Sequence, residues 1–443
     1  MTVAEPRSST TDDPLAEVRS WIEENWDPDL SVEQWWERLG LAGWSSALLP
    51  PNAYGRGLSR SDAVAVAREV AKFGAVGAPS GLGLLLAAPT IASHGTQAQI
   101  DGYVRDIVTG QQAWCQLFSE PGAGSDLAGL TTRAELDGDE WIVNGQKVWT
   151  SLGQSADMGM LIARTNVDVP KHQGITWMAI DMHQPGVEIR PLIEMTGHAM
   201  FNEVFLTDAR VPVDAVIGDV GQGWAAANTT LQAERAGLGA GGGGAAGPTP
   251  GTIAGNLSKR AGDVAPKKRE PNVLDGAPKG TPERPRAQRS HLFDFAKNNG
   301  TIKDPLIRQE LMRLHTLTTI GGYNAERVKA EKKQGRDIPG MANISKLMMS
   351  DVVRLQRDLG LRIIGANGML HAYTDEQRTA LNEATGNPFL GMVTGTALYA
   401  QAPPIYGGTD QIQKNIIGER ALGLPKEPNN DKTLPFSELP KNA

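Results

Sequence analysis

Hydrophobic residues over 13–110 repeat mostly at intervals of three and four, which is the spacing of one helix face. A clear example has apolar positions at Leu15, Val18 and Ile22. A further helix is predicted over 59–73, where Ser59 can serve as the N-cap and apolar positions follow at helical spacing. We therefore predict an N-terminal helical domain over 14–113, preceded by a polar tail over 1–13.

The pattern changes near residue 114 to short β-branched and aromatic segments separated by turn residues. The dipeptide Asp137-Gly138 lies between two alternating segments, which is a strong hairpin signal, and Asn144-Gly145 is a second dipeptide of this kind. The sequence therefore predicts an antiparallel β-domain over 114–220, built as a sandwich or a barrel.

Helical patterning returns after residue 220 and is interrupted at once by a segment over 239–290. This segment is rich in Gly and Pro and is basic, whereas the rest of the chain is acidic. Few of its residues could build a core, so we predict a mobile insertion. We expect a C-terminal helical bundle over 221–427 that contains this insertion, and a tail over 428–443. The predicted fold class is mainly α with a central β-domain (α+β).

Composition narrows the possible partners. The chain has 443 residues and a net charge of −7, which argues against nucleic acid or an anionic membrane as the main partner. The single cysteine, Cys115, cannot form an internal disulfide, which fits a reducing compartment. We find no apolar run of about 18 residues and no signal-peptide pattern at the start. The sequence thus predicts a cytoplasmic protein without a membrane span.

Several kinds of binding site are not indicated. The seven histidines are scattered and lack metal-ligand spacing, so no metal site is predicted. No phosphate-binding loop of the GxxxxGK[ST] type is found, and no GxGxxG lies between a strand and a helix. Nucleoside triphosphates and NAD are therefore not expected as ligands.

The most specific stretch of the chain is QLFSEPGAGSDLAGLTTR over 116–133. A tight Gly-rich loop such as PGAGSD exposes backbone N–H groups that suit polar or anionic ligand groups. Three more motifs follow in order, which are GQKVWTS over 145–151, FNEVFLTDARVP over 201–212 and IYGGTDQIQKNIIGER over 405–420. Together the four motifs resemble those of the acyl-CoA dehydrogenase family, whose patterns are T-E-P-x-A-G-S-D and N-G-x-K-x-W-I-[ST]-N.

The resemblance covers the chain from about residue 13 to residue 427, apart from the insertion. It implies an N-terminal helical domain, a middle β-domain and a C-terminal four-helix bundle. It also implies noncovalently bound FAD and assembly as a tetramer. The family reaction removes two hydrogens across Cα–Cβ of an acyl-CoA thioester, in which a carboxylate takes the α-proton and a hydride passes to flavin N5. The basic insertion could meet CoA phosphates or an acidic partner, although a solvated loop is the simpler interpretation.

The family motifs assign residues to the flavin and to the substrate. Ser125 matches the position that contacts the CoA portion, and Trp149 is expected to flank the flavin unless it is simply a buried hairpin aromatic. Arg362 and Gly365 lie in RIIGANG, which matches a segment that approaches the FAD of a neighbouring subunit. The complete set predicted for the cofactor is Gln116, Leu117, Phe118, Ser119, Trp149, Thr150, Ser151, Arg362, Gly365, Thr409 and Gln411.

The catalytic base departs from the commonest family pattern. Many members carry a Glu in Y-E-G-T, but this chain has Gly407 at that place, followed by Gly408 and Thr409. A minority of members, including isovaleryl- and long-chain-type enzymes, instead place a Glu before an Arg on a bundle helix. Glu234 and Arg235 match that pair, so Glu234 is the predicted base and Arg235 its neighbour in the substrate site. The alternative is that Glu234 is an ordinary carboxylate on a helix surface.

Loss of the side chain at residue 407 has two consequences. The backbone N–H of Gly407 can still donate to the thioester oxygen, because that donor does not depend on a side chain. The missing carboxylate also enlarges the pocket, so we expect a branched, long or polycyclic acyl group. Gly408 is predicted to contact the substrate beside it.

A second departure concerns assembly. Family members usually carry R-x-x-F-G after the first bundle helix, with the Arg on the FAD pyrophosphate, and this chain lacks that Arg. Some actinobacterial-type dehydrogenases, including steroid-catabolic ones, share each flavin site between two different subunits. We therefore expect either a homotetramer or an α2β2 tetramer, with an electron-transferring flavoprotein as acceptor. A non-catalytic structural subunit is the main alternative, and an oxidase on the same fold is a third.

Overall fold

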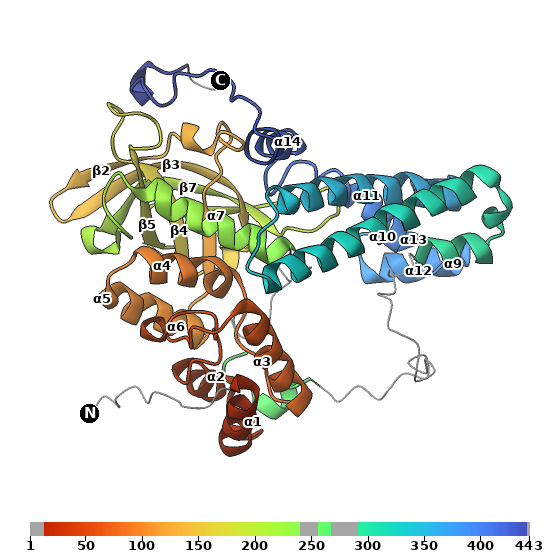
Figure 1. Ribbon diagram of the computed structural model, residues 1–443, viewed down its shortest axis with the longest axis horizontal. Helices are drawn as coiled ribbons and strands as arrows, with labels where there is room; N and C mark the ends of the chain where they lie inside the picture. The colour runs from red at the N-terminus through yellow and green to blue at the C-terminus, as the bar shows by residue number, and fades with distance from the viewer. Residues whose placement is uncertain (1–12, 240–255, 267–290, 441–443) are drawn as a thin grey trace. The chain divides into compact units, whose positions relative to one another are not determined.

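The computed structural model describes residues 13–239, 256–266 and 291–440 (Figure 1). The described residues divide into two compact units. The first contains 13–191, 201–239, 256–266 and 430–440, and the second contains 192–200 and 291–429. The predicted N-terminal helices and the predicted β-domain, apart from residues 192–200, lie in the first unit.

Helices build the N-terminal part of the first unit, as predicted. The indole N–H groups of Trp35 and Trp36 on one helix bond the carbonyls of Val76 and Gly77, at 2.8 and 2.7 Å, so two large buried side chains leave no unpaired donor there. Ser59 caps its helix by accepting from the backbone N–H of Asp62, which confirms the predicted start. The elements are α1 (Pro14–Asn25), α2 (Val32–Leu41), α3 (Arg60–Phe73), a π-helical turn (Gly83–Ala87), α4 (Ala88–His94), α5 (Gln97–Gln99), a second π-helical turn (Ile100–Val104) and α6 (Arg105–Val108).

In the described part of the chain, seven strands form one sheet in the order β1-β4-β2-β3-β7-β6, with β5 paired to β4. The β2–β3, β3–β7 and β4–β5 pairs are antiparallel, as predicted, but β4 pairs in parallel with β1 and, at one position, with β2, so the sheet is mixed. Helix α7 (Gly223–Gly239) packs against β5 and α4 (Figure 1). The strands are β1 (Trp114–Leu117), β2 (Arg133–Asp137), β3 (Glu140–Ser151), β4 (Met158–Arg164), β5 (Ile175–Asp181), β6 (Val187–Leu192) and β7 (Phe201–Pro212).

The two turn dipeptides have different structures. The turn at Asp137-Gly138 joins β2 to β3, as the sequence predicts. Asn144-Gly145 instead lies inside β3, where the register with β7 shifts. A Cβ atom on Gly145 would come within 2.3 Å of Thr132 Oγ1, so this glycine permits a close approach of two backbones rather than a turn.

Part of the predicted insertion is anchored rather than mobile. Residues 256–266 carry the short helix α8 (Ala261–Val264) and pack against α2. The backbone N–H of Val32 bonds the carbonyl of Lys259 at 2.8 Å, and that of Ala261 bonds the carbonyl of Leu30 at 2.7 Å. Ala261 is fully buried, so this short segment packs against the rest of the first unit through a small side chain and does not need a large apolar face. The remainder of the predicted insertion, 240–255 and 267–290, lies outside the described residues.

The second unit is helical. Its core is built by buried side chains such as Leu311, Leu359 and Leu390, and α10, α11 and α13 lie side by side (Figure 1). Helix α7, which the sequence prediction placed in the C-terminal bundle, groups with the sheet in the first unit instead. The helices of the second unit are α9 (His291–Asn298), α10 (Pro305–Lys333), α11 (Met341–Ile364), α12 (Asp375–Thr385), α13 (Leu390–Tyr399) and α14 (Asp410–Ile416).

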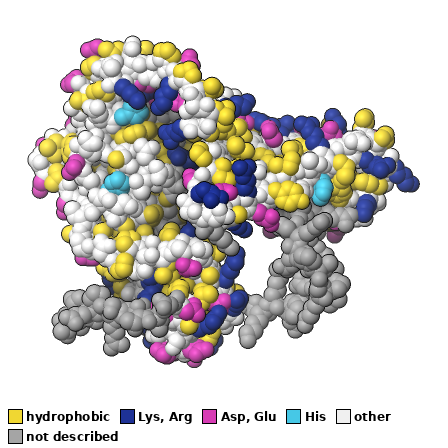
Figure 2. Space-filling view, viewed as in Figure 1, with side chains coloured by type: hydrophobic (Ala, Val, Ile, Leu, Met, Phe, Trp, Pro, Cys, Tyr) yellow, Lys and Arg dark blue, Asp and Glu magenta, His cyan; other side chains and the backbone are white. Residues whose placement is uncertain are grey.

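Apolar side chains are exposed on the second unit, and Figure 2 shows such side chains among charged ones on its helices. The longest helix, α10, contributes Leu306, Met312, Ile320 and Tyr323, of which Leu306 is 69% exposed. Among the described helices, none combines the length and the apolar character that a membrane crossing requires.

Candidate active site

Two predicted site residues from distant parts of the sequence meet in the first unit. Gln116 lies on β1, and its side-chain amide lies beside the carboxyl group of Glu234 on α7. Burial raises the pKa of Glu234 above its ordinary value, while the Gln116 amide and the charge of Arg235 act in the opposite direction. A raised pKa makes Glu234 a stronger proton acceptor than an ordinary glutamate carboxylate.

The segment that follows Gln116 runs beside β3. Leu117 and Phe118 are buried, whereas Gln116 and Ser119 are half-buried. The carbonyl of Ser119 accepts from the backbone N–H of Val148 at 2.9 Å. This bond places the predicted flavin segment 116–119 next to the second predicted flavin segment, 149–151.

Trp149 is not a buried hairpin aromatic. Its side chain is 61% exposed, and its backbone adopts a left-handed φ of 63°. The β3–β7 register shifts between Lys147 and Thr150, and this bulge turns the indole out of the strand. Its ring meets Phe201 edge to face, with centroids 5.9 Å apart. A strained residue that exposes a large aromatic ring is typical of a binding surface.

A buried ion pair holds the first end of the Gly-rich loop. The Lys147 ammonium lies 2.8 Å from Glu120 Oε1 and donates to the carbonyl of Phe118 at 3.1 Å. The Glu120 carboxylate also accepts from the backbone N–H groups of Thr131 and Thr132, at 2.7 and 2.9 Å. Burial alone would raise the pKa of Glu120, but Lys147 and these hydrogen bonds outweigh it and lower the pKa to about 2.

Two further buried cations hold the other end of the same loop. The Arg164 guanidinium donates to the carbonyls of Ala128 and Leu130, at 2.6 and 3.1 Å. The Lys171 ammonium bonds both carboxylate oxygens of Asp126, at 2.8 and 3.0 Å. The loop over 120–130 is thus fixed at both ends, while Ser125 at its tip is exposed. This arrangement keeps the loop's polar groups available to a ligand.

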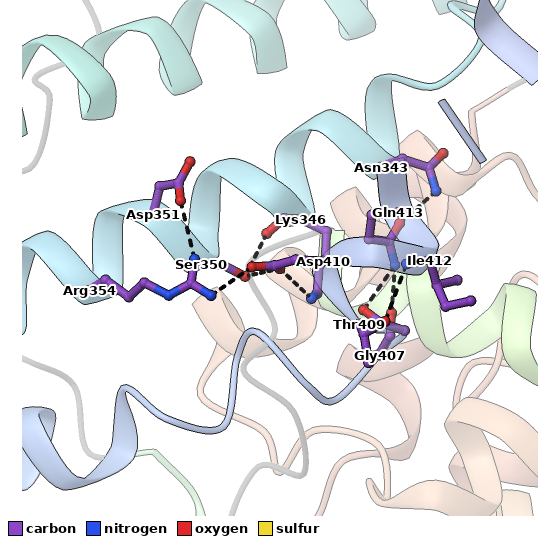
Figure 3. A network of polar contacts seen from close by, with 11 residues as sticks. Asn343, Lys346, Ser350, Asp351, Arg354, Gly407, Thr409, Asp410, Ile412 and Gln413 are labelled. Carbon is purple, nitrogen blue, oxygen red and sulfur yellow. Dashed lines mark hydrogen bonds and ion pairs between the residues drawn. The ribbon is translucent and has the colours of Figure 1, made fainter. Parts of the chain in front are cut away.

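In the second unit, side-chain amides fix the loop that contains YGGT. Gly407 and Gly408 have φ values of 61° and 82°, which glycine adopts at little cost. The side-chain amide of Gln413 donates to both of their carbonyls, at 2.9 and 3.2 Å (Figure 3). Asn343 on α11 donates to Gln413 Oε1 at 2.7 Å and so orients that amide.

An ionic network fastens the same loop to α11. Asp410 is buried and accepts from Lys346, Ser350 and Arg354, which follow one face of α11 at intervals of four residues (Figure 3). The three donor–acceptor distances are 3.1, 2.8 and 2.8 Å, in the same order. Burial alone would raise the pKa of Asp410, but these donors outweigh it and lower the pKa.

The other predicted residues of the second unit have local structural positions. Thr409 is the N-cap of α14 and accepts from the backbone N–H of Ile412 at 3.2 Å. Gln411 is exposed on the first turn of α14. Arg362 is exposed in the last turn of α11, and Gly365 ends that helix with a φ of 61°. The structure therefore groups the predicted site into two sets, one in each unit, and the pairing of Glu234 with Gly407 stays a prediction.

Comparisons with known proteins follow the same order of domains. The chain matches "Acyl-CoA dehydrogenase, N-terminal domain" over 8–111, "Acyl-CoA dehydrogenase, middle domain" over 115–209 and "Acyl-CoA dehydrogenase, C-terminal domain" over 291–422. It is 32% identical over 441 residues to the acyl-CoA dehydrogenase IpdE1 of Mycobacterium tuberculosis, which covers 93% of this chain and 97% of the relative. The chain belongs to the acyl-CoA dehydrogenase family.

Solved structures share this fold. "Tcur3481-Tcur3483 steroid ACAD" has a TM-score of 0.65 at 23% identity, covering 93% of this chain and 97% of that one. The ChsE4-ChsE5 complex from Mycobacterium tuberculosis has a TM-score of 0.61 at 25% identity, covering 95% and 100%. The resemblance drawn from the motifs is thus confirmed, as are the fold class and the assignment as an enzyme. Family membership also implies a flavin cofactor.

The residues beside β1 and β3 fit a flavin. The Thr150 hydroxyl is buried and has no hydrogen-bond partner among the described residues, and Ser119 and Ser151, which belong to the same two segments, are half-buried. The exposed indole of Trp149 adds a planar apolar surface. Hydroxyl and backbone groups next to an exposed aromatic ring suit a large, planar, polar heterocycle.

Sequence reasoning gave no role to the cations that fix the two loops. Lys147 was the easiest of these cations to notice, because it lies on the buried side of β3, where the other buried residues include Val143 and Thr150. A charged residue at such a position needs a buried partner. Arg164 likewise ends an apolar strand. Asp410 and Gln413 lie inside a quoted motif, but their partners on α11 come from a remote segment with no pattern that points to them.

Proposed function

We propose that this chain catalyses FAD-dependent α,β-dehydrogenation of an acyl-CoA thioester, with Glu234 as the base. The observation that carries the proposal is the carboxyl group of Glu234, whose pKa burial raises and which Gln116 holds beside the predicted flavin segment. Glu234 takes the α-proton of the thioester onto a carboxylate oxygen, and the Cα–Cβ single bond becomes a double bond. FAD, when bound, supplies the acceptor for the hydride that leaves the β-carbon.

The remaining residues bind and orient. Gln116 keeps the Glu234 carboxylate in one rotamer, and so limits the positions that the α-carbon can take. The backbone N–H of Gly407 donates to the thioester oxygen, which stabilises the negative charge that develops there. Gln413 fixes the conformation of that loop through the carbonyls of Gly407 and Gly408. Ser125, at the tip of the Gly-rich loop, binds the CoA portion.

The residues proposed to contact FAD come from separate segments of the chain. In the first unit, the backbone of 116–119 and the hydroxyls of Ser119 and Ser151 face the isoalloxazine, with Trp149 beside it. In the second unit, Thr409 and Gln411 bind the adenine diphosphate portion. Arg362 and Gly365 approach the FAD of a neighbouring subunit.

The acyl group is proposed to be branched, long or polycyclic. Gly407 places no side chain where many relatives carry a carboxylate, so this part of the pocket is larger and less charged. The Tcur3481-Tcur3483 steroid ACAD shares the fold. A bulky apolar acyl group would also exclude water from around Glu234, and so maintain the burial that raises its pKa.

The assembly is proposed to be a homotetramer or an α2β2 tetramer that passes electrons to an electron-transferring flavoprotein. The exposed apolar side chains along α10 support an association of subunits. A related fold occurs in the ChsE4-ChsE5 complex from Mycobacterium tuberculosis. The absence of the R-x-x-F-G arginine favours a partner that completes the flavin site, and together with Gly407 it supports the second candidate, a non-catalytic subunit.

The visible spectrum of the purified chain tests the proposal. A yellow protein whose flavin absorbance bleaches on addition of one of a panel of branched, long-chain or steroid-derived acyl-CoAs is the expected result. A colourless folded protein that gains flavin only with a related subunit would support the mixed tetramer. Unchanged turnover of that complex carrying Glu234→Gln would make this chain the non-catalytic subunit and reject Glu234 as the base.

A further inference from the structure

The last described residues of the chain pack on the β-domain of the first unit. This segment, 430–439, is called here the C-terminal strap, and Figure 1 shows its dark-blue end beside the loops of the sheet. The backbone N–H of Phe436 bonds the carbonyl of Val169 at 2.9 Å, and that of Ser437 bonds the carbonyl of Val167 at 2.9 Å. The strap, which the sequence analysis treated as a tail, therefore pairs with the connection between β4 and β5.

Phe436 covers one of the cations that hold the Gly-rich loop. Its ring centroid lies 3.4 Å from the guanidinium carbon of Arg164, which is only 3% exposed. The edges of that guanidinium donate to the carbonyls of Ala128, Leu130 and Lys171. An aromatic ring on the open face of a guanidinium attracts the cation and keeps water away from it. Phe436 thus protects the bonds that Arg164 makes to the loop.

Asp431 contacts the second cation. The Lys171 ammonium forms ion pairs with Asp431 of the strap and with Asp126 of the loop, and its side chain is only 7% exposed. An ammonium group has three N–H donors, so the two carboxylates satisfy the group between them. Removal of either carboxylate would leave a buried cation with fewer acceptors and make Lys171 less fixed.

We infer that the C-terminal strap positions the Gly-rich loop over 120–130 for acyl-CoA, with Phe436 acting through Arg164 and Asp431 acting through Lys171. The inference rests on the proposed function only for the identity of the ligand. Both strap residues are positioning residues, because each reaches the loop through a cation. The strap therefore controls affinity for the CoA portion, whereas Glu234 controls the proton transfer.

The test uses the full-length assembled protein with Asp431→Asn and Phe436→Leu. The matched control is Glu438→Gln, which removes an exposed carboxylate from the same strap, and Asp431→Glu tests rescue. Two readouts are needed, which are hydrogen exchange of the backbone amides over 122–130 and the Kd for free coenzyme A. The kcat and KM are then measured with whichever acyl-CoA bleaches the flavin.

In Asp431→Asn and Phe436→Leu, the backbone amides of the loop are expected to exchange faster with solvent than in the parent protein. The Kd for coenzyme A and the KM for acyl-CoA should rise about threefold to tenfold, while kcat stays within about twofold of the parent value. Asp431→Glu restores the parent values, and Glu438→Gln leaves them unchanged. Unaltered exchange and affinity in both variants would overturn the inference, as would a loss of kcat at constant KM. If no acyl-CoA reacts with the parent protein, the proposed function fails, but loop exchange and coenzyme A affinity still decide the role of the strap.

Discussion

The side-chain amide of Gln116 on β1 lies beside the carboxyl group of Glu234 on α7. The two residues carry different predicted roles, one beside the flavin and the other as the base. The amide favours the ionised carboxylate, whereas burial favours the neutral acid and dominates, so the pKa of Glu234 is raised. A base that is both oriented and more basic than an exposed carboxylate is what removal of a weakly acidic α-proton requires.

The raised pKa of Glu234 predicts the acid side of the activity profile. At low pH the carboxyl group is protonated and cannot accept the α-proton. We expect kcat/KM to fall about tenfold per pH unit on the acid side, with an apparent pKa above the ordinary glutamate value of 4.5. Steady-state rates across pH, with flavin absorbance monitored to confirm retention of the cofactor, measure this. An acid limb at or below pH 4.5 would mean that another group controls it.

The raised pKa of Glu234 also predicts how the stability of the fold changes with pH. Because the pKa of Glu234 is higher in the folded state than in the unfolded chain, its ionisation destabilises the fold, and this cost appears as pH rises through the folded-state pKa. Glu234→Gln is therefore expected to melt at a higher temperature than the parent protein near pH 8. The difference should disappear near pH 4, where both side chains are neutral. Gln232→Ala on the exposed side of α7 is the control, and a pH-independent difference would contradict the prediction.

Lys147→Met is expected to destabilise the fold strongly. The substitution leaves the Glu120 carboxylate buried without its cation, and breaking a buried pair in this way costs about 3–5 kcal/mol. Urea unfolding followed by circular dichroism measures the loss. Lys72→Met, which removes an exposed partner of Glu69, should destabilise the fold far less. Equal losses of unfolding free energy for the two substitutions would show that the buried pair stabilises the fold no more than an exposed one.

The lowered pKa of Glu120 adds an acid dependence to stability. The parent protein keeps the contribution of this carboxylate above the ordinary pKa of 4.5 and loses it as pH falls toward about 2. A shift of this size corresponds to about 3 kcal/mol. Unfolding free energies measured between pH 5 and pH 3 should therefore decline in the parent protein. Stability that stays constant over this range would contradict the assigned pKa.

Gln413→Glu tests the loop of the second unit. The substitution replaces the amide donor to the Gly407 and Gly408 carbonyls with a carboxylate that repels them. We expect kcat to fall about 10- to 100-fold, because a displaced loop misplaces the predicted thioester donor. Lys414→Gln, at the exposed position next along α14, should leave kcat unchanged. Parent-like kinetics for Gln413→Glu would remove this loop from the account of the site.

Local patterns predicted local structure well. The N-cap at Ser59 and the turn at Asp137-Gly138 were both correct, because each depends on a few neighbouring residues. Asn144-Gly145 was misleading, since the same dipeptide also suits a strand where two backbones approach closely. Its meaning depends on Thr132, which no local pattern identifies.

The ion pairs and hydrogen bonds that hold the site loops in place could not be predicted either, because their partners are also remote in the sequence. Lys171 bonds Asp126 and Asp431, and Asp410 bonds side chains of α11, so each network joins segments that only the folded chain brings together. Motifs identified the candidate base and the candidate flavin segments. The burial of Glu234, which raises its pKa, and the position of Gln116 beside it required the fold.

The most direct test of the central claim is the reductive half-reaction. The parent protein and Glu234→Gln, each matched for flavin content, are mixed without oxygen with the acyl-CoA that bleaches the parent, and the flavin absorbance is followed in time. The account predicts that Glu234→Gln binds this acyl-CoA with the parent affinity but bleaches at least about 100-fold more slowly. Bleaching at the parent rate would show that Glu234 is not the base.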